Sequence, residues 1–304
     1  MNELELLKHI YATATAPSAE VPIPPGDDMA MVSVGGRSIL VAIDQVVAGC
    51  HYDEAVTPLS LVGRKAITRC LSDVAAMAAR PLVSLVAATL PVALGERRAT
   101  ELFDAVRETA EHYDCPLIGG DIAIYRQVAG PLVCSVAIMA EPTGLGPIRR
   151  AGARVGDRVY VTGVLGGTRA DDGLGHHLLF EPRLAEARLL AETLGQRLHA
   201  MIDLSDGLGR DASHLAERSG VQIVFDAERI PCRSGAPWRQ ALSEGEDYEL
   251  CFVATGEVPS TLEGIPVTAA GEVCRREPGA PLVVVRSGGR NLDATELGWE
   301  HRSP

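Results

Sequence analysis

The aspartates of this chain are its most informative residues, because they recur in short motifs beside glycines or where strands are expected to end. These motifs are Gly26-Asp27-Asp28, Asp44, Asp73, Gly119-Gly120-Asp121 and Asp203-Leu204-Ser205-Asp206-Gly207. Carboxylates that come from separate segments suit hard cations such as Mg²⁺, which usually bridge protein carboxylates to substrate phosphates. The chain already has a net charge of −12, so further clustered carboxylates need a cation to offset their repulsion. The pattern therefore predicts a magnesium-dependent enzyme that acts on phosphates.

The composition narrows the class of protein further. At 304 residues, of which 46% are hydrophobic, the chain is long enough for about two globular domains. A net charge of −12 argues against nucleic acid or an anionic membrane as a partner. The seven cysteines are scattered without a Cys-x-x-Cys pair, the first residues are acidic, and no apolar run is long enough for a membrane span. We therefore expect a cytoplasmic enzyme with reduced cysteines.

Strand-like and helix-like segments alternate along the sequence. Helical spacing of apolar residues predicts a helix over residues 58–79, and a β-rich run predicts a strand over residues 38–46. Further strands are expected at residues 82–90, 116–118, 131–139, 158–162, 221–226, 248–254 and 282–286, and further helices at residues 96–113, 182–198 and 208–219. A segment rich in Pro, Gly and Arg, residues 141–157, interrupts this order. We predict an α/β (α+β) protein of two domains with mixed sheets, residues 1–145 and 146–304.

Two of the aspartates occupy positions that favour a site over a structural role. Asp44 is expected at the end of a strand, and His51 follows it in a glycine-containing loop, where α/β proteins place ligands. Asp73 lies in an apolar helix face, four residues after Arg69. An Asp–Arg pair at this spacing contributes only about 0.2–0.5 kcal/mol, and aspartate is a poor helix former. A metal or polar cluster explains Asp73 better.

Glycine-containing motifs complete the candidate site. The pair Gly119-Gly120 before Asp121 permits a close backbone approach and a positive φ. Asp203, Ser205 and Asp206 put three side-chain acceptors directly ahead of a helix. One of them suffices for an N-cap, so the motif predicts a phosphate and metal site at the helix N-terminus.

Other catalytic signatures are missing from the sequence. Neither lysine is followed by Ser or Thr, which excludes a Walker A motif, and no kinase catalytic loop, Gly-x-Ser-x-Gly or zinc spacing occurs. The acidic run Glu246-Asp247-Tyr248-Glu249 fits either a site or a charged turn that enters a strand.

Taken in order, the motifs resemble the thiamine-monophosphate kinase family, part of the superfamily of aminoimidazole ribonucleotide synthetases and selenophosphate synthetases. The resemblance covers nearly the whole chain. Besides the aspartate motifs it rests on residues 44–51, 71–77, 150–153, 156–157, 160–163, 245–250 and 298–301.

The resemblance implies an N-terminal domain that dimerises and a cleft against the second domain that holds ATP and several Mg²⁺ ions. It implies metal ligands at Asp28, Asp44, Asp73, Asp121, Asp203 and Asp206, and ATP contacts at Tyr113, Gly120, Asp121, Arg150 and Ser205. It also implies that His51, Glu246 and Trp299 face thiamine phosphate, with Trp299 on the aromatic heterocycle. The chain departs from the family at Ala42, Ile43 and Ile122, where family members usually carry hydroxyl side chains.

The expected reaction is transfer of the ATP γ-phosphoryl group to thiamine monophosphate, giving thiamine diphosphate in a homodimeric enzyme. No catalytic base is expected, because the acceptor phosphate, with a second pKa of about 6, is already largely dianionic at neutral pH. Two alternatives remain: a synthetase-type enzyme that uses ATP and another phosphorylated substrate, and a weakly active nucleotide-binding homologue.

Overall fold

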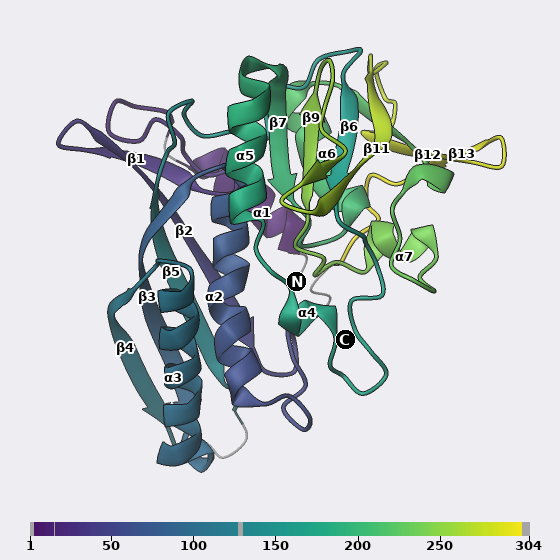
Figure 1. The fold of residues 1–304 in the computed structure, drawn as a ribbon. Helices are drawn as coiled ribbons and strands as arrows, with labels where there is room; N and C mark the ends of the chain where they lie inside the picture. The colour runs from purple at the N-terminus through teal and green to yellow at the C-terminus, as the bar shows by residue number, and fades with distance from the viewer. Residues whose placement is uncertain (1–2, 15, 127–129, 300–304) are drawn as a thin grey trace.

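The computed structural model describes residues 3–14, 16–126 and 130–299 and contains two β-sheets that lie side by side (Figure 1). The first sheet and its helices come from the first half of the chain. Its elements are α1 (Glu3–Thr13), β1 (Ala30–Val34), β2 (Arg37–Val47), α2 (Leu59–Ala76), β3 (Arg80–Pro91), α3 (Glu96–His112), β4 (Leu117–Tyr125) and β5 (Val133–Glu141).

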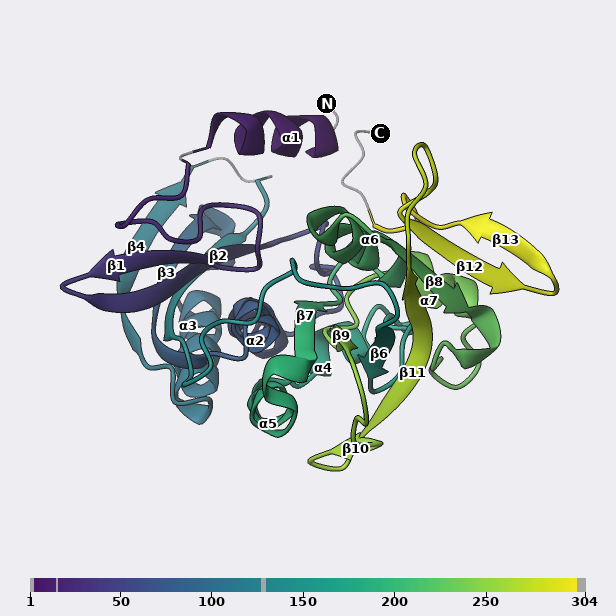
Figure 2. The same ribbon diagram turned by 90° about the horizontal axis from the view of Figure 1, so that it is seen from above.

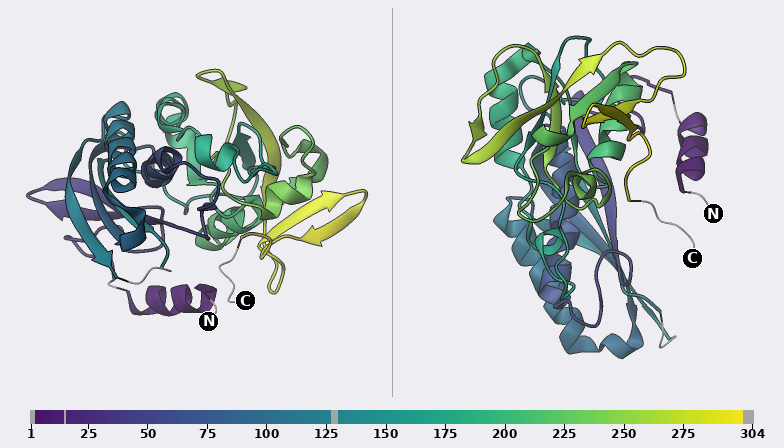
Figure 3. Two further views of the ribbon diagram at one scale, coloured as in Figure 1. Left: turned by 90° about the horizontal axis from the view of Figure 1, so that it is seen from below. Right: turned by 90° about the vertical axis from the view of Figure 1, so that its right-hand side faces the viewer.

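The strands of the first sheet are ordered β1-β2-β5-β3-β4. All neighbours are antiparallel except β3 and β4, so the sheet is mixed, as expected. Helices α2 and α3 cover one face, and in the described parts of the chain no helix packs closely on the other face (Figure 2). Helix α1 lies on the side of that open face and stands apart from both sheets (Figure 3).

Helix α2 is the central element of the molecule. Apolar residues at helical spacing, among them Val62, Ile67, Leu71 and Val74, bury one stripe completely. The helix ends at Ala76, and Ala78 then adopts a positive φ of 51°. It packs against α3 on one side and against α5 and β7 of the second half on the other. Any polar side chain on α2 can therefore face both halves of the chain.

The second sheet comes from the second half of the chain. Its elements are β6 (Arg158–Thr162), α4 (His176–Leu179), α5 (Leu184–Leu194), β7 (Leu198–Asp203), α6 (Leu208–Ser219), β8 (Gln222–Asp226), α7 (Trp238–Ser243), β9 (Leu250–Ala254), β10 (Thr261–Leu262), β11 (Ile265–Cys274), β12 (Val283–Ser287) and β13 (Arg290–Asp293). The main path runs β13-β12-β8-β11-β6-β9-β7, and β10 pairs with β11. Alternate strand residues pack on α5 and on α6 with α7, so the sheet is covered on both faces.

The expected fold class is confirmed, and several expected bounds coincide with the structure. Helix α6 and strand β6 have the predicted limits. The helix expected to reach residue 198 instead ends at Leu194, because Gly195 takes a positive φ of 55° and strand β7 follows. The segment between β5 and β6, residues 142–157, contains no helix or strand, and the predicted domain boundary falls within it.

None of the helices in the described parts of the chain is long and apolar enough to cross a bilayer. Within the described parts of the chain, no disulfide joins any of the seven cysteines.

Candidate active site between the two sheets

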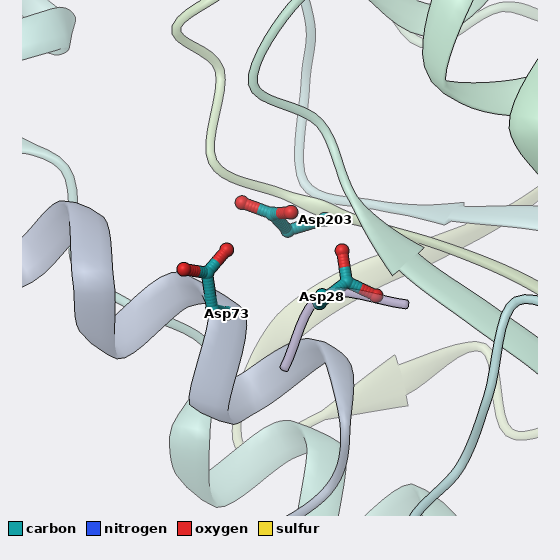
Figure 4. A group of neighbouring side chains, drawn as sticks. All are labelled: Asp28, Asp73 and Asp203. Atoms are coloured by element: carbon teal, nitrogen blue, oxygen red, sulfur yellow. The ribbon is translucent and has the colours of Figure 1, made fainter. Parts of the chain in front are cut away.

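Three aspartates meet where the two halves of the chain join. Asp28 comes from the loop before β1, Asp73 from α2 and Asp203 from the end of β7. Each offers a carboxylate oxygen, and these oxygens lie within 4.8 Å of one another (Figure 4). The sequence predicted all three as metal ligands, and the fold brings them together from positions up to 175 residues apart.

Neighbouring side chains hold two of these carboxylates in place. Arg150 donates to Asp28 Oδ1 at 2.7 Å, and the Ser72 hydroxyl donates to Asp203 Oδ2 at 2.6 Å. The second oxygen of Asp28 is buried and has no hydrogen-bond partner among the described residues. Such a buried oxygen is costly unless a ligand satisfies it.

The carboxylates of this acidic cluster destabilise one another's charge. Burial raises the pKa of Asp203 to about 7, with a further contribution from Asp28. Burial also raises the pKa of Asp73 well above its usual value, and Asp203, Asp44 and Asp28 add to the effect. A bound cation offsets both the burial of these carboxylates and their mutual repulsion. Oxygen-only donors of this kind fit Mg²⁺.

Asp44 lies beside the cluster but is bound elsewhere. Its Oδ2 accepts a hydrogen bond from Arg69 at 2.9 Å. The expectation that Asp44 ends a strand is wrong, because β2 continues to Val47 and pairs with β5 along its length. Arg69 therefore pairs with Asp44 across to the sheet rather than with Asp73 on its own helix.

The segment before α6 differs from the predicted N-cap. The cap residue is Gly207, without a side-chain cap, and the backbone N–H groups of Asp206 and Gly207 both donate to Asp211 Oδ2 at 3.0 Å. A carboxylate inside the first turn thus takes two of the N–H groups that the sequence assigned to phosphate. Ser205 lies in the same loop, and its carbonyl accepts from Glu246 N at 2.8 Å.

Gly120 and Asp121 lie in the middle of β4 rather than in a turn. A Cβ on Gly120 would lie 1.8 Å from the Val86 carbonyl oxygen, so the close backbone approach is confirmed. The glycine pair does not use the positive φ that it permits, because both glycines belong to a strand. Asp121 shares a row with Ala87, Ser135 and Gln45 on the open face of the first sheet. This face is opposite to the one that carries Asp44.

The departures from the family are distributed over both faces of the first sheet. Ala42 faces α2 and is almost buried, whereas the side chain of Ile43 is 70% exposed on the open face. Ile43 therefore points away from Asp44. Ile122 follows Asp121 in β4 and is also exposed.

Tyr113 follows α3 and contacts the segment between α4 and α5 of the second half. Its hydroxyl bonds to the carboxylate of Glu181, which also binds Arg64 of α2. Burial raises the pKa of Tyr113, and Glu181 reinforces the shift. The structure thus places Tyr113 at the α4–α5 connection and not in the acidic cluster.

The three residues predicted to face the acceptor are linked by two cations. Lys65 Nζ donates to the His51 carbonyl at 2.6 Å and to Glu246 Oε1 at 2.5 Å. Arg169 Nη2 donates to Glu246 Oε2 at 2.8 Å, and its guanidinium lies 5.8 Å from the centre of the Trp299 ring. His51, Glu246 and Trp299 therefore belong to one region of the structure.

A strained backbone presents Glu246. Its φ is +59°, a left-handed value that non-glycine residues adopt at a cost of about 1–3 kcal/mol. The preceding Gly245 has a φ of +73°, and a Cβ there would lie 2.7 Å from the Ser205 carbonyl oxygen. The loop of Glu246 and the loop of Ser205 thus touch through their main chains. Strain of this kind concentrates at functional sites.

Sequence reasoning missed Lys65, Arg169 and Asp211. Lys65 is one of two lysines in the chain and lies in the buried part of α2, which is an unusual position for a lysine. A signal for it exists in the sequence, because residues 65, 69 and 73 are spaced by four and share one helix face. Arg169 has no comparable signal, since its loop acquires its position only through tertiary contacts.

Comparison with known proteins places this architecture in a class. The family model described as AIR synthase related protein, N-terminal domain, matches residues 26–141, and the corresponding C-terminal domain matches residues 154–281. This chain, which has an acidic cluster where its two halves meet, is thus an AIR synthase related protein.

Curated relatives define the family within that class. The thiamine-monophosphate kinase of Rhodopirellula baltica is 33% identical over 279 residues, covering 84% of this chain and 85% of the relative. The thiamine-monophosphate kinase of Escherichia coli strain K12 is 30% identical over 331 residues, covering 98% and 96%. The chain belongs to the thiamine-monophosphate kinase family.

Solved structures share the fold over nearly the full length. The structure of AaThiL complexed with AMPPCP and TMP superposes with a TM-score of 0.81 at 28% identity, covering 99% of this chain and 97% of the other. The HypE–HypF complex gives a TM-score of 0.75 at 15% identity, which shows a common fold alone.

Proposed function

We propose that this protein transfers the γ-phosphoryl group of ATP to thiamine monophosphate and forms thiamine diphosphate. The observation that carries the proposal is the acidic cluster of Asp28, Asp73 and Asp203, which contains a buried oxygen without a partner. The relatives that cover most of the chain are thiamine-monophosphate kinases, and a structure similar to this one contains AMPPCP and TMP.

In this proposal the acidic cluster holds Mg²⁺, and Asp44 and Asp206 contribute nearby. Mg²⁺, when bound, supplies positive charge that offsets the repulsion between donor and acceptor phosphates. Arg150 keeps the Asp28 carboxylate turned so that one oxygen remains available to the cluster. Ser72 does the same for Asp203. The acceptor phosphate is largely dianionic, so the residues need to orient and neutralise rather than to remove a proton.

In this proposal the two domains supply different parts of the active site. Residues 1–145 form the ATP- and metal-binding domain, and residues 146–304 complete the cleft with Asp203, Ser205 and Glu246. Tyr113, Gly120 and Arg150 contact ATP, and His51, Glu246 and Trp299 face the acceptor. The lack of disulfides among the described residues agrees with a cytoplasmic location.

Turnover with a panel of acceptors tests the function directly. ADP release should require both Mg²⁺ and thiamine monophosphate, and other phosphorylated acceptors should give little. Rapid turnover with a different phosphorylated substrate would favour the synthetase alternative. Binding of ATP in calorimetry without turnover on any acceptor would favour the nucleotide-binding homologue.

We further propose that the protein is a homodimer that buries the open face of the first sheet. Two apolar rows cross that face, Val41–Met139–Val83 and Ile43–Ala137–Leu85. Ile43 and Met139 are 70% and 37% exposed. An uncovered apolar sheet face is typical of an interface. Asp121 lies in the next row, so its proposed metal role depends on this dimer.

Replacing Ile43 with lysine is expected to convert the dimer into a monomer. A charge in the centre of the apolar rows would be buried without a partner if the two faces met. Light scattering after size exclusion measures the mass. Val155→Lys is the matched control, because Val155 is 59% exposed but lies in the connection between the sheets. A dimeric Ile43→Lys protein would refute this interface.

Replacing Trp299 with alanine is expected to raise the KM for thiamine monophosphate about tenfold while the KM for ATP changes less than about twofold. The main chain at Trp299 is anchored without the ring, since its N–H donates to Asp206 O and its carbonyl accepts from Arg210, both at 2.8 Å. The melting temperature should therefore change little. Equal losses for both substrates would point to a structural role for the ring.

A further inference from the structure

Lys65 is a buried cation that the proposed chemistry does not yet use. Its side chain is 0% exposed in the middle of α2. A buried ammonium group is strongly destabilising unless its three N–H groups find acceptors. The structure supplies three: the His51 carbonyl at 2.6 Å, His177 Nδ1 at 3.1 Å and Glu246 Oε1 at 2.5 Å.

These three acceptors come from separate parts of the chain. His51 belongs to the loop after β2, His177 to α4 and Glu246 to the loop before β9. The imidazole of His177 accepts through Nδ1, and its Nε2–H donates to the Gly173 carbonyl at 3.2 Å, so the ring is neutral. Burial and the charge of Lys65 lower the pKa of His177 to about 4, in agreement with this tautomer. Lys65 thus joins the loop after β2 in the first half to α4 and the loop before β9 in the second half.

Glu246 depends on cations from two sides. Lys65 holds Oε1 from the buried side, while Arg169, whose side chain is 42% exposed, holds Oε2 from the outer side. Burial alone would raise the pKa of Glu246, but Lys65 and Arg169 hold it at about 2. Because the backbone of Glu246 is also strained, this carboxylate is fixed more firmly than a surface acid would be.

We propose that Lys65 is a positioning residue of the acceptor site, which is anchored on the His51 main chain and from there holds the Glu246 carboxylate in place. This inference rests on the proposed function, because it assigns His51 and Glu246 to the acceptor. Lys65 itself is enclosed and acts through Glu246. Its loss should therefore weaken the acceptor and not ATP.

Steady-state kinetics of Lys65→Met test the inference. The KM for thiamine monophosphate should rise about tenfold or more, and the KM for ATP should stay within about twofold. Arg183→Met is the matched control. Arg183 forms a buried ion pair at 2.5 Å with Glu249, which belongs to the same acidic run as Glu246. Among the described residues, Arg183 pairs with Glu186 and Glu249 and not with Glu246 itself. This control should lower the melting temperature and leave the ratio of the two KM values unchanged.

A double-mutant cycle separates positioning from direct contact. If Lys65 acts through Glu246, then Lys65→Met combined with Glu246→Gln should give the same acceptor KM as Glu246→Gln alone, within about twofold. Additive effects, or equal losses for ATP and acceptor, would overturn the inference. Should Lys65→Met not fold, Lys65→Gln, which keeps two N–H donors, enters the same comparison. A wild-type protein without turnover on thiamine monophosphate would instead refute the proposed function.

Discussion

Replacing Asp73 with asparagine should lower kcat by about 10³-fold or more and, without metal, make the protein more stable. Asp73 is the member of the acidic cluster that α2 supplies, and its carboxylate lies close to those of Asp203 and Asp28. Its pKa is raised, so at neutral pH its charge costs folding free energy that a neutral amide would not. ADP-release assays and thermal melts measure the two effects.

The effect of Mg²⁺ on the melting temperature provides a second test of the role of Asp73. Addition of Mg²⁺ should raise the melting temperature of the wild-type protein through mass action, and it should do so much less for Asp73→Asn. Asp104→Asn serves as the matched variant, since Asp104 lies on the exposed surface of α3 with its side chain 58% exposed. Near wild-type turnover of Asp73→Asn at saturating Mg²⁺ would remove Asp73 from the metal site.

Replacing Arg150 with methionine should lower turnover about 100-fold and raise the Mg²⁺ concentration needed for half-maximal rate. Arg150 pairs with Asp28 at 2.7 Å, with only 18% and 0% of the two side chains exposed. Loss of one partner of a buried ion pair costs about 3–5 kcal/mol, because the remaining charge stays buried. Asp28 would then lose the contact that orients it toward the cluster.

The neighbouring arginine offers a closely matched comparison. Arg149 pairs with Asp27 at 2.9 Å, one residue before each partner of the Arg150 pair, and is 42% exposed. Asp27 is outside the acidic cluster. Arg149→Met should therefore cost some stability and leave the half-saturating Mg²⁺ concentration unchanged. Identical kinetics for the two variants would mean that Arg150 only joins the two segments.

The sequence was sufficient for the fold class and for the three aspartates that the structure brings together. Asp28, Asp73 and Asp203 were recognisable because aspartate is unexpected inside an apolar helix face and beside glycines. Helix α6 and strand β6 were predictable to the residue, since an apolar period is bounded by glycines in one and by polar turns in the other.

What the sequence could not predict depends on contacts between distant segments. Strand β7, which pairs with β9, was not predicted, because its short sequence, which contains His199 and Asp203, does not distinguish a strand from the end of the preceding helix. Asp121 was expected beside the other ligands, but a sequence motif does not show on which face of the sheet a strand residue lies. The partners of Lys65 lie 14, 112 and 181 residues away, so the lysine looked like an isolated residue.

The polar face of α2 sets a distance between two chemistries. In the proposed function Lys65 serves the acceptor side and Asp73 the metal side, and the eight residue steps from one to the other span about 12 Å along the helix axis at 1.5 Å per residue. The rigid helix thus fixes the distance between the acceptor site near Lys65 and the metal site at Asp73. One inserted residue within this stretch would turn Lys65 by about 100° relative to Asp73 and separate the two ends of the reaction, although each cluster by itself would remain intact.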